Sequence, residues 1–184
     1  MIKKVTKFLA LLAAVLMSVT PVMAEDGFYV IAAGRPEVGA KITRLPFSIN
    51  TPGYYFLTSN LSYSNGNAIT VNCDNVTIDL MGFRLAGPSN NNYVGIQING
   101  GNNVKVRNGT LAGWYEGVWG SGGSRHRMIN VRANGNTYGF YLNGDDHLVE
   151  KCTAIQGSFG TGAGIVLNST GKVSDCTVMN FSSY

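Results

Sequence analysis

The sequence predicts an all-β fold, a right-handed, single-stranded parallel β-helix (solenoid) of about five to six coils with a short N-terminal capping segment. A short segment of the form Gly-apolar-x-apolar-Asn recurs at nearly constant intervals. Each copy alternates apolar with other residues at period two, which is typical of a strand with one buried face. The sequence shows no apolar stripe at 3.6-residue spacing, and this argues against helical and leucine-rich solenoids.

The first repeated element defines the coils. Its copies are Ala68–Asn72, Gly95–Asn99, Gly117–Ser121, Gly139–Asn143 and Gly164–Asn168, whose starts differ by 27, 22, 22 and 25 residues. A coil of this length cannot bury its apolar face alone, so the coils must stack and share one core. Stacking predicts one inward ladder of Ile69, Ile96, Val118, Phe140 and Ile165, and another of Val71, Ile98, Leu142 and Leu167.

A second element follows each copy at a similar distance. Its copies are Val106–Leu111, Met128–Ala133, Val149–Ala154 and Val173–Val178, with Ile78–Leu85 as a longer version. A polar column of Asn108, Asn130, Lys151 and Asp175 interrupts the apolar pattern in these copies. Because Asn and Asp tolerate left-handed backbone angles better than most residues, we expect a short bend at this column.

The N-terminus reads as a signal peptide covering residues 1–24. Lys3, Lys4 and Lys7 precede an apolar run over Phe8–Met17, and Ala24 stands at the expected cleavage site. The apolar run is too short for a stable membrane span, and nothing later is long enough. We therefore expect a secreted or periplasmic protein. Residues 25–52 are predicted to cap the solenoid, with strands over Phe28–Ile31 and Ile42–Ile49, and residues 53–184 to form a β-helix domain that is possibly C-terminally incomplete.

The net charge of the predicted mature chain is close to neutral. Cleavage of the leader reduces the 14 Lys and Arg to 11, against 10 Asp and Glu. This balance gives no reason to expect a nucleic-acid or membrane-surface partner. The basic cluster Arg125-His126-Arg127 is interpreted as a solvated turn.

The repeats also resemble a known family. Asn75–Phe83 and Gly95–Gly100 are similar to segments of right-handed parallel β-helix repeat proteins within the pectate lyase-like superfamily, and the resemblance covers about residues 53–184. It implies the fold more than an activity, since this fold includes lyases, hydrolases, adhesins and proteins of no known chemistry. In enzymes of the superfamily, substrate usually lies along the outer face of the first strand column, where carboxylates bind calcium or act as acid and base.

Acidic residues are missing from the corresponding column here. It consists of Thr70, Gln97, Trp119, Tyr141 and Val166, whereas a lyase needs acidic cation ligands and a base, and a glycosidase needs two carboxyls. We therefore predict no catalytic residue, metal site or cofactor, with calcium expected only if the protein is a lyase.

Two polar motifs were weighed as alternatives. Asp145-Asp146 after Gly144 resembles a motif of polygalacturonases, but the other motifs of that family are absent, so a solvated turn is the preferred interpretation. His126 and His147 are expected on the surface, because two imidazoles without a third ligand make a poor zinc site.

Aromatic side chains are the better indication of a ligand. Trp119 and Tyr141 should be neighbours on the exposed strand face, and Trp114 and Tyr115 lie just before a first strand. Exposed rings one coil apart can stack on sugar rings, with Gln97 as a hydrogen-bond partner. The alternative is that these rings cover their own loops and edge the core.

Three cysteines allow at most one internal disulfide. The alternation points Cys152 and Cys176 inward in one column, where buried thiols behave as small apolar groups. A disulfide between them stays possible in an oxidising compartment.

The leading hypothesis is an exported β-helix that binds or decorates an extracellular or envelope polysaccharide without catalysis. One alternative is a polysaccharide lyase or glycoside hydrolase, of pectate lyase-like or polygalacturonase-like type, in which Asp145, Asp146 or Glu116 would matter. Another is a structural or adhesive solenoid that self-associates through an uncapped C-terminal coil.

Overall fold

The computed structural model describes residues 30–32, 35–37, 39–89, 92–157 and 161–181. The predicted signal peptide and Phe28 lie outside these residues. The chain divides into two units, residues 1–38 and 39–184. In the first unit, β1 (Val30–Ala32) pairs with β2 (Arg35–Glu37) as antiparallel strands. No helix in the described ranges is both long and apolar enough to cross a membrane.

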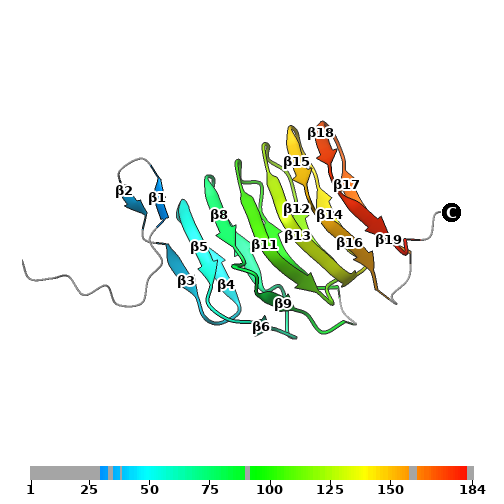
Figure 1. Cartoon of the computed structure of the whole chain (residues 1–184), viewed down its shortest axis with the longest axis horizontal. Coiled ribbons are helices and arrows are strands. Elements are labelled where there is room, and N and C mark those ends of the chain that lie inside the picture. Colours follow the sequence, from blue (N-terminus) through cyan, green and yellow to red (C-terminus); the bar gives the residue numbers. More distant parts are fainter. Residues whose placement is uncertain (1–29, 33–34, 38, 90–91, 158–160, 182–184) are drawn as a thin grey trace, which may run out of the picture. The chain divides into compact units, whose positions relative to one another are not determined.

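The second unit is a parallel solenoid of short strands (Figure 1). One sheet has six strands, in the order β17 (Ala163–Leu167), β14 (Tyr138–Leu142), β12 (Glu116–Gly120), β10 (Val94–Ile98), β7 (Ile69–Val71) and β4 (Phe47–Ile49). The other sheet has eleven strands. Seven of them follow one another in the order β18 (Gly171–Ser174), β15 (His147–Glu150), β13 (Arg127–Asn136), β11 (Lys105–Ala112), β8 (Val76–Asp79), β5 (Gly53–Leu57) and β3 (Ala40–Ile42). The remaining four pair beside this path and are β16 (Thr153–Gln156), β19 (Thr177–Met179), β9 (Arg84–Ala86) and β6 (Leu61–Ser62). The predicted all-β solenoid of about six coils is confirmed.

The predicted inward ladders are in register. Ile96 pairs with Ile69 and Val118, and Phe140 pairs with Val118 and Ile165. The side chains of this ladder that are fully buried are Ile69, Ile96, Val118 and Phe140. Since a fully buried aliphatic or aromatic side chain contributes about 1.5–3 kcal/mol, these ladders are a main source of stability.

The predicted bend lies at the polar column. Asn108, Asn130, Lys151 and Asp175 have φ angles of 56°, 54°, 53° and 55°. These are left-handed angles that short polar residues tolerate. Strands β11 and β13 continue through the bend, whereas at Lys151 the chain divides into β15 and β16. A second left-handed column, which the sequence analysis missed, joins the two sheets at Asn75, Asn103, Arg125 and Asp146.

The parallel stack begins at Ala40, within the segment expected to cap it. Strand β4 pairs with β7, so that Ile49 lies beside Val71, and β3 pairs with β5, so that Ile42 lies beside Leu57. Ile42 and Ile49 are fully buried. These strands therefore form a first coil that continues the register of the later ones.

Glycine starts four of the five copies of the first element, with Ala68 at this position in the earliest copy, and its recurrence has a steric cause. A Cβ atom on Gly117 would lie 2.6 Å from the carbonyl oxygen of Gly139 in the next coil, and one on Gly139 would lie 2.4 Å from that of Gly164. Side chains cannot fit where successive backbones approach this closely. The recurring glycine is thus a requirement of stacking.

The prediction of surface histidines was wrong. His126 and His147 are 0% and 2% exposed, and their rings stack with centroids 4.9 Å apart and an interplanar angle of 4°. Each Nδ1 accepts a backbone N–H, from Val104 to His126 and from His126 to His147. The rings are buried because they continue an inward column that holds Val76 and Val104 in the preceding coils.

Hydrogen bonds determine which ring nitrogen carries the proton in both histidines. Nδ1 accepts a hydrogen bond in both rings, and Nε2 lies 3.0 Å from the Gly122 carbonyl in His126 and 3.1 Å from the Asn143 carbonyl in His147. These contacts place the proton on Nε2. Burial lowers the pKa of His126, with His147 adding to the effect, while the Gly122 carbonyl and the carboxylate of Asp74 oppose it.

The cysteines are free thiols in this structure. Cys152 is 1% exposed, as predicted for an inward position, and burial raises its pKa to about 12. Cys176 is half-buried, and its Sγ accepts a hydrogen bond from the Cys152 backbone N–H at 3.4 Å. The buried Cys152 thiol therefore behaves as a small apolar group rather than as a nucleophile.

Candidate functional site

The outer surface of the six-stranded sheet carries a group of rings, Tyr115, Trp119, Tyr138 and Tyr141, called here the aromatic face. Trp119 and Tyr141 are direct partners in the register of β12 and β14, and both are half-buried. Their predicted adjacency is confirmed. The alternation explains this placement, because Val118 and Phe140 beside them point into the core.

Two tyrosines extend these rings toward the start of the strands. Tyr138 contacts Tyr141 edge-on at 5.6 Å between centroids, and Tyr115 contacts Tyr138 in the same way at 5.5 Å. Edge-to-face packing at this distance is favourable for aromatic rings. Tyr138 therefore connects the predicted residues Tyr115 and Tyr141.

Trp114 does not belong to this face, and the expectation that its ring is exposed beside the others was wrong. It is 2% exposed, and its Nε1–H donates to the Leu85 carbonyl at 3.1 Å. The ring fills the space above Gly87 and Gly95, where an added Cβ would lie 2.6 Å and 3.0 Å from ring atoms. The glycines of the neighbouring coils thus accommodate a core tryptophan, a relationship that the order of residues alone does not reveal.

Amides border the aromatic face, with Gln97 directly beside Trp119 in the register and Asn99, Asn143 and Asn168 just after the strands. Gln97, the predicted hydrogen-bond partner, donates to Asn99 Oδ1 at 2.6 Å and accepts from Asn67. Asn168 donates to the Tyr141 hydroxyl at 2.9 Å and to Asn143 Oδ1 at 2.8 Å. These contacts fix the amides in place beside the rings, where they present donors and acceptors suited to sugar hydroxyls.

Glu116 is the one acidic residue in the six strands of this sheet. It is half-buried and pairs in register with Tyr138. Burial raises its pKa to about 7, so it is partly protonated at neutral pH. A carboxyl in this state can donate a hydrogen bond, but a glycosidase also requires a second, ionised carboxylate as base or nucleophile.

The acidic pair Asp145-Asp146 occupies an exposed turn, as predicted. Ser169 donates to Asp145 at 2.5 Å, and this hydrogen bond lowers the pKa of Asp145. Asp146 has a left-handed φ of 58°, and its N–H donates to Thr170 at 2.9 Å. Asp145 is therefore held in its ionised form, and the hydrogen bonds of both residues are committed to a turn. Within the described part of the chain, no group of three or more His, Cys, Asp or Glu could hold a metal ion.

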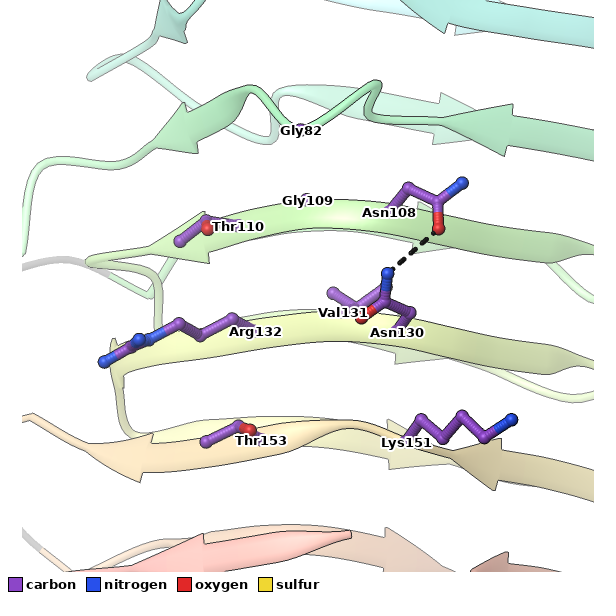
Figure 2. A pocket seen from close by; sticks show the side chains of 9 residues that line it. All are labelled: Gly82, Asn108, Gly109, Thr110, Asn130, Val131, Arg132, Lys151 and Thr153. Carbon is purple, nitrogen blue, oxygen red and sulfur yellow. Dashed lines mark hydrogen bonds between the residues drawn. The ribbon is translucent and has the colours of Figure 1, made fainter. Parts of the chain in front are cut away.

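A second surface, which the sequence analysis missed, lies over the bend of the eleven-stranded sheet. It is an open depression of about 290 Å³. Figure 2 shows its lining residues on successive coils, with Asn108 and Asn130 joined by a hydrogen bond of 3.1 Å. The remaining lining residues are Gly82, Gly109, Thr110, Val131, Arg132, Lys151 and Thr153. The signal in the sequence was cationic residues recurring at the coil spacing.

Comparison with known proteins gave one match. A family model described as "Right handed beta helix region" matches residues 47–184. No curated protein and no solved structure matches the chain.

Proposed function

Because the chain belongs to the right-handed β-helix family, whose fold is consistent with polysaccharide-related proteins, we propose that it binds polysaccharide through the aromatic face. The ligand is an extracellular or envelope glycan, and the protein holds it without cleaving it. Signal-peptide cleavage near Ala24 and export to the periplasm or the exterior form part of this proposal.

The observation that carries the proposal is the register of Trp119 with Tyr141. Rings on adjacent parallel strands lie about 4.8 Å apart in the hydrogen-bonding direction. They offer two neighbouring apolar surfaces on which sugar rings can stack. The amides of Gln97 and Asn143 lie at the same surface and supply polar contacts.

A binding role is favoured over cleavage by the charge on this face. Glu116 is the single acid in the six strands, and Asp145 and Asp146 are held in a turn by Ser169 and Thr170. Inverting and retaining glycosidases both place two carboxyls about 5–10 Å apart on either side of the bond to be broken. The aromatic face offers one carboxyl with a raised pKa and no second group in its strands.

The test is a glycan array followed by titration of the strongest ligand. Trp119→Ala and Tyr141→Ala should each weaken binding by about tenfold, which corresponds to about 1.4 kcal/mol. Tyr63→Ala is the matched control, since Tyr63 is a half-buried tyrosine outside the six strands, and it should retain the affinity. Unchanged binding in both aromatic-face variants would contradict the proposal.

Activity measurements separate binding from cleavage. The enzymatic alternative predicts release of reducing ends or unsaturated products from pectin-like polymers, with loss of that activity in Glu116→Gln or in Asp145→Asn/Asp146→Asn. The binding proposal predicts that the intact protein leaves the bound polymer at its original length, as measured by size-exclusion chromatography.

A further inference from the structure

The positive charge of the solenoid is concentrated on one side. The outer surface of the eleven-stranded sheet, called here the basic face, carries most of the Lys and Arg of residues 39–184. These cations are Lys41, Arg84, Lys105, Arg107, Arg127, Arg132, Lys151 and Lys172. The near-neutral net charge of the predicted mature chain therefore hides a strongly asymmetric distribution.

Register aligns these cations along the stack. Lys105 and Arg127 are direct partners on β11 and β13, and Lys172 continues the same column one coil beyond Leu148. On the far side of the bend, Thr110 lies between Arg84 and Arg132. Adjacent strands lie about 4.8 Å apart, which is comparable to the rise of one sugar along an extended polysaccharide.

Carboxylates offset little of this charge. Asp79 is buried and forms an ion pair with Arg107 at 2.7 Å, and Glu150 lies 3.8 Å from Lys151. Asp175 is the other acid on this face. Arg84, Lys105, Arg127, Arg132 and Lys172 form no ion pair with another described residue. Cations left without carboxylate partners and repeated at close spacing attract a polyanion.

The depression over the bend supplies neutral polar contacts among these cations. Arg132 and Lys151 line it together with the amides of Asn108 and Asn130 (Figure 2). The hydroxyls of Thr110 and Thr153 line it on either side of Arg132, in register with that residue. Amides and hydroxyls beside guanidinium and ammonium groups match a ligand that carries both hydroxyls and anionic groups.

We infer that the basic face is a second binding surface, distinct from the aromatic face, and that it binds the anionic groups of an acidic polysaccharide. The polymer runs along the stack, across the strands, so that successive carboxylate or sulfate groups meet cations on successive coils. This inference rests on the proposed function for the choice of a glycan, whereas the preference for anionic groups follows from the charge distribution alone.

Other polyanions fit this face less well. Single-stranded nucleic acids bind on grooves that combine cations with stacking aromatic rings. The strands that carry Lys105, Arg127, Arg132 and Lys172, which are β11, β13 and β18, contain no Phe, Tyr or Trp. Tyr54 on β5 stacks on Phe56 and lies beside Arg107, but its hydroxyl is bound to buried Asp79. Anionic membranes bind basic surfaces that also insert apolar side chains, whereas Lys105, Arg127 and Arg132 alternate with residues buried in the core.

The experiment measures binding of the full-length protein to alginate and to carboxyl-reduced alginate, which has the same backbone without charge. Alginate should bind at least about tenfold more tightly at about 50 mM NaCl, with the difference lost as salt screens the charges. Poly-dT and anionic phosphatidylglycerol vesicles are the comparison probes. Equal affinity for the two alginates, or tighter binding to either comparison probe, would overturn the inference.

Matched variants locate the site. Arg127→Gln/Arg132→Gln should weaken alginate binding by at least about tenfold, and Lys105→Gln/Lys172→Gln should do the same with other residues of the face. Arg44→Gln/Arg125→Asn removes the same charge from turns outside the face and should change the affinity by less than about twofold. An equal loss of alginate affinity in the Arg44→Gln/Arg125→Asn control would overturn the assignment of the binding site to the basic face. Binding to carboxyl-reduced alginate should be unchanged in every basic-face variant, which separates this result from a failure of the aromatic face.

Discussion

The two outer faces of the same coils differ in chemistry although they are built from one repeat. The six-stranded sheet presents rings and amides and has one acid and no Lys or Arg in its strands, whereas the eleven-stranded sheet presents cations. Trp119 and Arg127 are only eight positions apart, yet they lie on different sheets. The comparison shows that stacking constrains the inward positions and leaves each outward column free to acquire its own chemistry.

The largest expected difference in stability is between an inward and an outward substitution on the same strand. Phe140→Ala should destabilise the protein by about 3–5 kcal/mol, because the ring is fully buried and its loss leaves a cavity. Tyr141→Ala, the next residue, should cost about 1 kcal/mol, since its ring is half-buried on the outside. Urea unfolding of both variants measures this, and equal losses would contradict the assigned alternation.

The two ion pairs of the basic face should contribute differently to the free energy of unfolding. Asp79→Ala should cost about 1–3 kcal/mol, because buried Asp79 accepts hydrogen bonds from Arg107, Tyr54 and the Met81 N–H. Glu150→Ala is the matched control, which removes the same charge from an exposed pair and should cost less than about 1 kcal/mol. Urea midpoints give the comparison. A larger loss in Glu150→Ala would show that the charge balance of the face, rather than the buried network, determines its stability.

The histidine stack should make stability depend on pH. The pKa of His126 is lowered by folding, so the unfolded chain binds more protons than the folded one below about pH 6.5. Stability should be complete above that pH and fall as the pH decreases through the folded pKa, by at most about 1.4 kcal/mol per unit for this group. Thermal unfolding from pH 8 to 5 should show a shallower dependence for His126→Val, because Val104 occupies the same column without titrating. An unchanged dependence would exclude His126 as the origin.

Glu116 should give a pH dependence of stability with the opposite sign. Its pKa is raised to about 7 by burial, so its contribution to stability is present below the unfolded value of about 4.3 and is lost as the pH rises through 7. Glu116→Gln should therefore raise the thermal midpoint at pH 8 relative to the parent protein and leave it nearly unchanged at pH 4. A lower thermal midpoint of Glu116→Gln at pH 8 would show that the folded protein stabilises the ionised Glu116 carboxylate, which contradicts the raised pKa.

Features that follow from alternation and coil spacing could be predicted from the sequence. The ladder through Ile96, the bend at Asn108 and the adjacency of Trp119 to Tyr141 all depend on matching positions in successive coils. Trp114 was misplaced because its burial depends on an individual fit over the glycines of neighbouring coils, which the period does not reveal. His126 does occupy a periodic inward position after Val76 and Val104, but its burial also requires backbone hydrogen bonds to its ring nitrogens, which only the structure shows.

The basic face was missed for a different reason. Only Arg125, His126 and Arg127 are clustered in the sequence, and two of these three are not outward residues of the strand column. Lys105, Arg127 and Lys172 come together only when the coils are stacked in register. A count of net charge averages over both sides of a solenoid and therefore hides such a surface.

The most direct test of two separate binding surfaces is a crossed titration with alginate and carboxyl-reduced alginate at low salt. Trp119→Ala/Tyr141→Ala should lose affinity for the uncharged polymer while keeping salt-dependent binding to alginate, and Arg127→Gln/Arg132→Gln should show the reverse. If both double variants lost affinity for both polymers in the same proportion while remaining folded, a single shared site would replace the two faces.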